Sequence, residues 1–219
     1  MIKKSEPKAY IYFLLGAVCL LGFLAEYVML KAEMLLYGKN YYKFTITESI
    51  THWVLICVVW GMISLVMFYI AVRVYGFDIS RKNNKPDAKG IITGILLISG
   101  AIGVKFHVYE GWKCVIDFKN SGGYQFIFQY IYYLFEIFLL AVSLALLQEG
   151  CEKVFKKLEA PFGGILIALT WGLSHIISQD SLYIGLTYFA LSLLFGAAYI
   201  AFKKNLYITF LFMAIMFLV

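Results

Sequence analysis

Residues 10–30 read YIYFLLGAVCLLGFLAEYVML, and Glu26 is the only charged residue among them. A helix needs about 20 mostly apolar residues to cross the hydrocarbon core of a bilayer. Residues 10–30 meet that length, and further apolar runs follow along the chain. We predict seven membrane-spanning helices, at residues 10–30, 52–74, 90–108, 124–148, 160–178, 182–202 and 206–219. The last run is short, so it either crosses part of the bilayer or leans on its neighbours.

The composition is that of a membrane protein over its whole length. The 219 residues are 62% hydrophobic and 15% charged, whereas soluble proteins are about 45–50% apolar and about 25% charged. The cysteines, at positions 19, 57, 114 and 151, form no CxxC pair, which argues against a zinc knuckle or a disulfide framework. We predict an all-α, polytopic bundle that forms one integral-membrane domain over residues 1–219. Its expected surroundings are the lipid bilayer, and a nucleic-acid partner is excluded.

The basic residues predict the orientation of the bundle, because cytoplasmic loops carry an excess of Lys and Arg. With the N-terminus inside, the inner segments hold Lys3, Lys4, Lys8, Arg73, Arg81, Lys82, Lys85, Lys89, Lys153, Lys156, Lys157, Lys203 and Lys204. The outer segments hold only Lys31, Lys39, Lys43, Lys105, Lys113 and Lys119. We therefore predict an N-in topology. Lysine greatly outnumbers arginine, which is typical of an AT-rich genome, and we expect the plasma membrane of a bacterium.

The stretch LQEGCEKVFKK, residues 147–157, carries the densest group of charges. Glu149, Glu152, Lys153 and Lys156 are spaced i, i+3, i+4 and i+7, so they share one face of a helix. One interpretation is a solvated helix end with ordinary Glu149–Lys153 and Glu152–Lys156 pairs. The other is a functional polar site, since ionisable groups within membrane helices are costly.

The second polar stretch is TWGLSHIISQD, residues 170–180, in which Trp171 lies one helical turn before His175. A membrane histidine often serves only to join helices by hydrogen bonds. However, a turn is expected at Pro161, and Glu149 and His175 are at similar distances from it in sequence. An antiparallel pair of helices would then bring Glu149 and His175 to one depth and one cavity, bordered by Gln148, Lys153 and Trp171. A carboxylate and an imidazole there could activate a water or bind a divalent metal.

The order Gln148-Glu149-x-x-x-Lys153, a turn, then Trp171-x-x-x-His175 resembles the CAAX protease and bacteriocin-processing (CPBP) family of intramembrane endopeptidases. That family carries Glu-Glu-x-x-x-Arg, then Phe-x-x-x-His, then a late His-x-x-x-Asn. The resemblance covers residues 141–219 and leaves the helices of residues 1–140 unmatched. It implies that Glu149 and His175 are catalytic and activate a water, with Gln148, Glu152, Lys153 and Trp171 at the border of the site.

This sequence departs from the family at its third motif, where alignment puts Met213 and Phe217 in place of His and Asn. Three functions follow from the sequence. The first is a Glu/His peptidase acting on a membrane peptide or protein, with no cofactor or an unknown divalent metal. The second is an inactive homologue that binds such a partner, as an immunity protein does. The third is a small transporter that uses Glu26, Glu136 and His175 as a polar path. We expect His52 and His107 to lie at the membrane interface.

Overall fold

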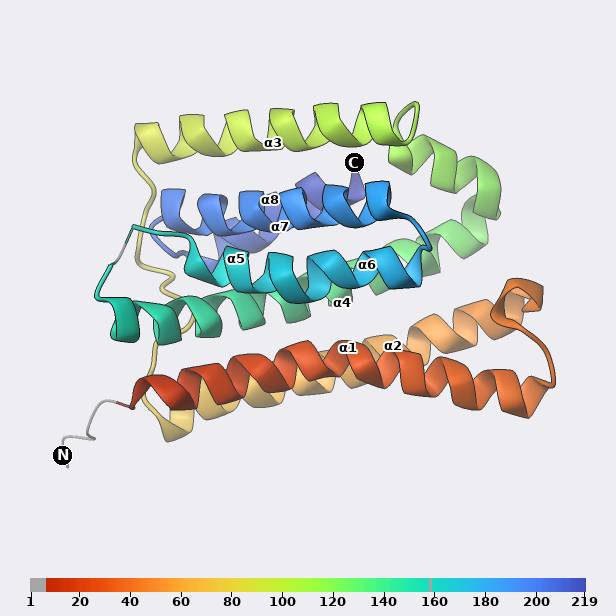
Figure 1. The fold of residues 1–219 in the computed structure, drawn as a ribbon, viewed down its shortest axis with the longest axis horizontal. Coiled ribbons are helices and arrows are strands. Elements are labelled where there is room, and N and C mark those ends of the chain that lie inside the picture. Colours follow the sequence, from red (N-terminus) through yellow and green to blue (C-terminus); the bar gives the residue numbers. More distant parts are fainter. Residues whose placement is uncertain (1–6, 158) are drawn as a thin grey trace.

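The computed structural model describes residues 7–157 and 159–219, and its regular elements there are all helical (Figure 1). The helices are α1 (Ala9–Tyr37), α2 (Ile46–Tyr69), α3 (Ala88–Val108), α4 (Lys113–Phe155), α5 (Phe162–Ile167), α6 (Leu173–Ser178), α7 (Leu182–Ala201) and α8 (Leu206–Leu218). A 3-10 turn, η1 (Tyr41–Lys43), and two π-helical turns, η2 (Ile70–Val74) and η3 (Ala168–Gly172), complete the chain. The turn η3 joins α5 and α6 into one continuous rod.

Five helices are long and apolar enough to cross a membrane. These are Ala9–Tyr37, Ile46–Val74, Ala88–Val108, Lys113–Phe155 and Leu182–Ala201. Two shorter apolar helices, Phe162–Ser178 and Leu206–Leu218, lie among them. The chain therefore fits an integral membrane protein of the expected all-α class, whereas the seven crossings and the N-in orientation stay predictions.

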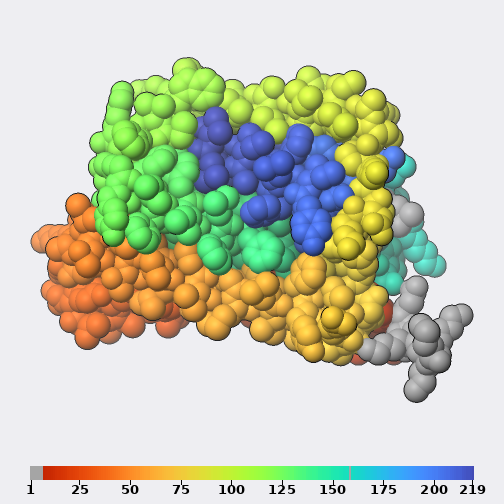
Figure 2. Space-filling view, turned by 180° about the vertical axis from the view of Figure 1, so that it is seen from behind, coloured from red at the N-terminus to blue at the C-terminus, as the bar shows by residue number. Residues whose placement is uncertain are grey.

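Helix α4 is the centre of the bundle, and α1, α2, α5 and α8 all pack against it. In Figure 1, α1 and α2 lie on one side of α4, and α3, α7 and α8 lie on the other. Figure 2 shows α8 from behind, exposed between α3 and α4. The α4 side chains in the run from Ile137 to Leu147 are almost all buried, and Ser143 is the one polar residue among them. This run forms an apolar layer in the middle of the bundle.

Side-chain caps fix where several helices begin. Thr45 and Glu48 form a reciprocal capping box at the start of α2. Asp87, Ser181 and Asn205 each accept a hydrogen bond from the backbone N–H three residues later, at the starts of α3, α7 and α8. The chain thus reverses direction over short, well-defined connections.

The connections gather at two ends of the bundle (Figure 1). One end holds the start of α1, residues 75–87, residues 156, 157 and 159–161, and the turn at residues 202–205. We call it the basic end, because Arg81, Lys153, Lys203 and Lys204 lie there. The opposite end holds residues 38–45, 109–112 and 179–181.

Candidate functional site

Glu149 lies near the basic end and is held by two cations. Its carboxylate forms an ion pair with the Arg81 guanidinium, and its Oε1 is 3.7 Å from Nζ of Lys153. These three side chains, with Tyr12 and Asp78, line a cavity of about 340 Å³. Glu149 thus anchors residues 75–87 to α4, and the i,i+4 pair with Lys153 expected from the sequence is present.

Gln148 and Glu152 make a second set of contacts at the basic end. The Gln148 Oε1 accepts a hydrogen bond from the Gly163 N–H at 2.8 Å, and its Nε2 donates to Glu152 at 2.7 Å. Glu152 forms its ion pair with Lys204, in place of the Lys156 partner expected from the sequence. These contacts join α4 to the start of α5 and to the turn between α7 and α8.

His175 lies in a different environment. Its Nδ1 is 2.9 Å from the carbonyl oxygen of Trp171, one turn earlier. Its ring stacks on Tyr188 with 4.0 Å between the centroids. The Trp171 indole N–H donates to Glu136 at 3.1 Å, so Trp171 does not border the cavity beside Glu149.

The structure does not bring Glu149 and His175 together. Helix α4 ends at Phe155, six residues after Glu149, whereas His175 comes thirteen residues after the start of α5 at Phe162. At 1.5 Å per residue these are about 9 Å and about 20 Å along the helices from the basic end. The expected match assumes helix from Glu149 to Pro161, but residues 156, 157 and 159–161, which the structure describes, are not helical. The part of the chain that the structure describes contains no group of three or more His, Cys, Asp or Glu placed to hold a metal ion.

A partly buried group of ionisable residues lies instead between α1, α2 and α4. We call Glu26, Glu33, His52, Tyr132 and Glu136 the acidic cluster. His52 Nδ1 is 2.6 Å from Glu33 Oε2, and His52 Nε2 is 3.8 Å from Glu26 Oε1. The Tyr132 hydroxyl donates to Glu26. His52 is buried among these helices, with an exposed fraction of 2%, and its place at the membrane interface stays a prediction.

The acidic cluster has little basic counter-charge. Glu33 and Glu136 are both buried, with exposed fractions of 7%. Among the ion pairs of residues 7–157 and 159–219, Glu26 and Glu33 pair only with His52, and Glu136 has no Lys or Arg partner. Large rings enclose the cluster: Trp60 is 5.0 Å from Tyr132 between centroids, and Trp171 donates to Glu136.

Sequence reasoning found part of this cluster and missed the rest. Glu26 and Glu136 stand out as charges within apolar runs, and Glu136 was expected to need a partner. Glu33 was missed because the first span was ended at residue 30, whereas α1 continues to Tyr37. His52 opens the predicted second span, and its contact with Glu33 depends on how α1 and α2 pack.

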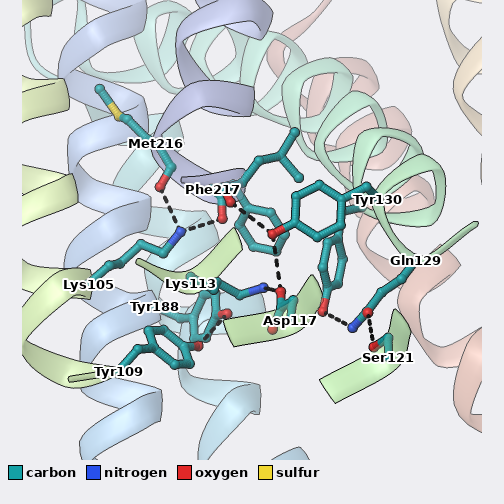
Figure 3. Close-up of polar contacts among 12 residues, drawn as sticks. Lys105, Tyr109, Lys113, Asp117, Ser121, Gln129, Tyr130, Tyr188, Met216 and Phe217 are labelled. Carbon is teal, nitrogen blue, oxygen red and sulfur yellow. Dashed lines mark hydrogen bonds and ion pairs between the residues drawn. The ribbon is translucent and has the colours of Figure 1, made fainter. Parts of the chain in front are cut away.

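A second polar network lies at the opposite end, between α3, α4 and α8 (Figure 3). Lys105, expected in an outer segment, is buried in α3 and donates to the backbone carbonyls of Met216 and Phe217. The Lys105 Nζ therefore caps the last carbonyls of α8 by hydrogen bonds. Lys113 pairs with Asp117, and the Tyr109 and Tyr188 hydroxyls are 3.1 Å apart. In this network, in contrast to the acidic cluster, each buried charge meets complementary groups.

The chain matches no protein-family model, no curated protein and no solved structure. The resemblance to the CPBP family therefore stands on the motif residues alone. The function proposed below therefore depends on the geometry of the acidic cluster and of the cavity beside Glu149.

Proposed function

We propose that this protein is a membrane transporter in which a small ion moves through the acidic cluster. The observation that carries the proposal is the presence of three carboxylates in membrane helices without a Lys or Arg partner among the described residues. Burying a charge without compensation costs several kcal/mol. Intramembrane Asp, Glu and His residues mark ion pathways and proton relays, where that cost is offset by function.

The cluster has the arrangement of a path. Glu33 contacts His52, His52 approaches Glu26, and Glu26 accepts from Tyr132. Tyr132 and Glu136 are one turn apart on α4, so they lie on the same face. These contacts lead from the opposite end toward the middle of the bundle.

The path stops at the apolar layer of α4. Glu136 and Gln148 are twelve residues apart, about 18 Å along the helix, and the layer between them is closely packed. An ion can leave toward the basic end only if the helices rearrange. This favours alternating access, as in transporters, over an open channel. With the basic end cytoplasmic, as the positive-inside rule predicts, the cluster faces the external side of a bacterial plasma membrane.

The test is the current that follows a jump in Na⁺, K⁺ or H⁺ concentration over proteoliposomes on a solid support. We expect the wild type to give a current with at least one of these ions. Glu136→Gln and Glu26→Gln should each reduce it by about tenfold or more, equivalent to about 1.4 kcal/mol of barrier. Glu48→Gln is the matched control, because Glu48 is a carboxylate of α2 that pairs with Lys39 and lies outside the acidic cluster, and Gln preserves its capping box. Absence of current from folded wild-type protein with every ion contradicts the proposal.

The second candidate is the CPBP-like peptidase or its inactive homologue. It is favoured by the cavity beside Glu149, which is the glutamate of the motif. Glu149→Gln and His175→Gln, assayed for cleavage of membrane peptides, test it. Loss of cleavage in both variants would support the peptidase. Cleavage that both variants retain would exclude these two residues as its catalytic pair.

A further inference from the structure

His52 occupies an unusual position, with a carboxylate facing each of its ring nitrogens. Glu33 approaches Nδ1 at 2.6 Å and Glu26 approaches Nε2 at 3.8 Å. Both carboxylates belong to α1, two turns apart, and the imidazole of α2 fits between them. Tyr41 of η1 covers the ring edge-on, with 6.2 Å between centroids.

Glu33 carries the second observation. Its side chain is more than nine-tenths buried, and its Oε1 has no hydrogen-bond partner within the described residues. A buried carboxylate oxygen without a partner costs about 1–3 kcal/mol or more. Binding a proton removes the negative charge and with it most of that cost. The unpartnered oxygen is therefore a place where an arriving proton is stabilised.

The geometry selects a proton over a metal cation. A metal ion would need a lone pair of an imidazole nitrogen together with several oxygens on one side of the ring. Here each nitrogen already faces a carboxylate, and Glu26 and Glu33 lie at opposite ring nitrogens. They cannot meet one ion together with the imidazole. An imidazole that carries a hydrogen on both nitrogens, donates to Glu33 at 2.6 Å and faces Glu26 at 3.8 Å fits the site.

We infer that His52, held between Glu33 and Glu26, is the site that binds and relays a proton in the transport proposed above, on which this inference rests. A proton arriving at Glu33 Oε1 neutralises that carboxyl group. When His52 is neutral, with its hydrogen on Nε2, Glu33 passes a proton to Nδ1, and the resulting imidazolium is the proton-loaded form expected at neutral pH. The imidazolium releases the hydrogen of Nε2 to Glu26 when that carboxylate moves from 3.8 Å to hydrogen-bond distance, and a half-turn of the ring then brings the bare nitrogen back to Glu33. Only O–H and N–H bonds form and break, and one proton moves from Glu33 to Glu26.

Titratable groups from three elements surround His52. Helix α1 contributes Glu26 and Glu33, η1 contributes Tyr41, and α4 contributes Tyr132 and Glu136. Burial, followed by the negative charge of Glu26, raises the pKa of Tyr41. The Tyr41 phenol is therefore neutral at physiological pH and does not compete for the proton as a base.

The first test reads the protonation of His52 directly. The chain has 3 histidines, so protein labelled with ¹⁵N-histidine in nanodiscs gives few imidazole signals, and His52→Gln identifies that of His52. At neutral pH we expect hydrogens on both ring nitrogens of His52 in the wild type, and on one in Glu33→Gln, which keeps the shape of the side chain. Exposed His107 is the internal control. A His52 ring with one hydrogen in the wild type at neutral and acidic pH overturns the inference.

The second test separates this inference from the transport proposal. Proton jumps at constant Na⁺ should give a current, Na⁺ jumps at constant pH should give none, and folded Glu33→Gln should lose about tenfold or more of the proton current. Currents with Na⁺ alone would overturn the proton assignment and leave transport standing. A doubly protonated His52 without any current would support the proton site and contradict the transport function.

Discussion

The two charged regions of the molecule differ in how their charges are matched. At the basic end, Glu149 pairs with Arg81, Glu152 with Lys204, and Asp87 with Lys203. In the acidic cluster, Glu26 and Glu33 share a single histidine, and Glu136 accepts from the Trp171 indole and has no Lys or Arg at ion-pair distance among the described residues. We call a carboxylate matched when it pairs with a Lys or Arg, and unmatched when it does not. A matched pair holds chain segments together, whereas an unmatched carboxylate can still bind a cation.

The surroundings of the matched pairs support a structural role. Asn84 donates to the Lys203 carbonyl at 2.7 Å, and the Leu206 N–H donates to the Ser80 carbonyl at 3.0 Å. Backbone and side-chain hydrogen bonds thus join residues 75–87 to the turn between α7 and α8. The acidic cluster contains the opposite feature, the unpartnered Oε1 of Glu33.

The largest expected effect on stability comes from breaking a buried matched pair. Glu152→Ala leaves Lys204 in a mostly buried position without its carboxylate, which should lower the free energy of unfolding by about 3–5 kcal/mol. Lys153→Met is the matched control. Without the Lys153 ammonium, Glu149 is still paired with Arg81, so the free energy of unfolding should fall by less than about 1 kcal/mol. The free energy of unfolding is measured in detergent. Equal decreases for Glu152→Ala and Lys153→Met would show that the Glu152–Lys204 pair is no more important for stability than the Lys153 contact.

The pair of Arg81 and Glu149 should show measurable coupling. A double-mutant cycle with Arg81→Met and Glu149→Gln should give an interaction energy of about 0.5–3 kcal/mol, because both groups are mostly buried and in direct contact. The same cycle on Lys203 and Asp87, each about half exposed, should give a smaller interaction energy, because solvent screens an exposed pair. A stronger coupling in the exposed pair would show that burial does not decide the strength of these pairs.

Glu136→Gln should have a small effect on stability. Its side-chain oxygen still accepts from Trp171, and the buried charge is gone. We expect the free energy of unfolding to change by less than about 1 kcal/mol or to rise. A loss comparable to that of Glu152→Ala would mean that Glu136 is a structural residue, and the two regions would not differ as described.

The smallest effect concerns Asp87 and depends on pH. The Gly90 N–H and Lys203 hold the pKa of Asp87 below its ordinary value of 3.8. A lowered pKa in the folded state stabilises the fold above the ordinary value, and this contribution is lost as the pH falls through the folded value. Asp87→Asn, which keeps the cap, should therefore lower Tm slightly at neutral pH and not at strongly acidic pH. A Tm difference that is independent of pH would refute a role for this charge.

The sequence predicted some helices closely and others poorly, for identifiable reasons. The expected helix at 182–202 nearly coincides with α7, Leu182–Ala201, because a capping serine bounds its apolar run. Helix α1 runs past residue 30 to Tyr37, because the charges at Lys31 and Glu33 do not interrupt helical periodicity. Helix α4 begins at Lys113, before the predicted span at residue 124. Gly122 inside it has non-helical backbone angles, φ of 72° and ψ of 165°, so α4 consists of two helical parts joined at a kink. Apolar content marks where a chain crosses a membrane, but it does not mark where a helix ends.

Local sequence patterns also predicted only part of the acidic cluster. Glu136 is visible as a charge in the middle of an apolar run. The contact of Glu33 with His52 depends on how α1 and α2 lie against each other, which no local pattern encodes. Glu149 and His175 are at similar distances from Pro161 in sequence but not along the helices, because the described residues between Phe155 and Phe162 are not helical.

The central claim is that the unmatched carboxylates move ions and the matched ones hold the fold. The most direct test measures current and Tm together for Glu136→Gln and Glu152→Gln in the same proteoliposomes and detergent. The account predicts that Glu136→Gln loses the current and keeps its Tm, whereas Glu152→Gln has a lower Tm and, where folded, keeps the current. The reverse pattern, with current lost only in Glu152→Gln, would contradict it.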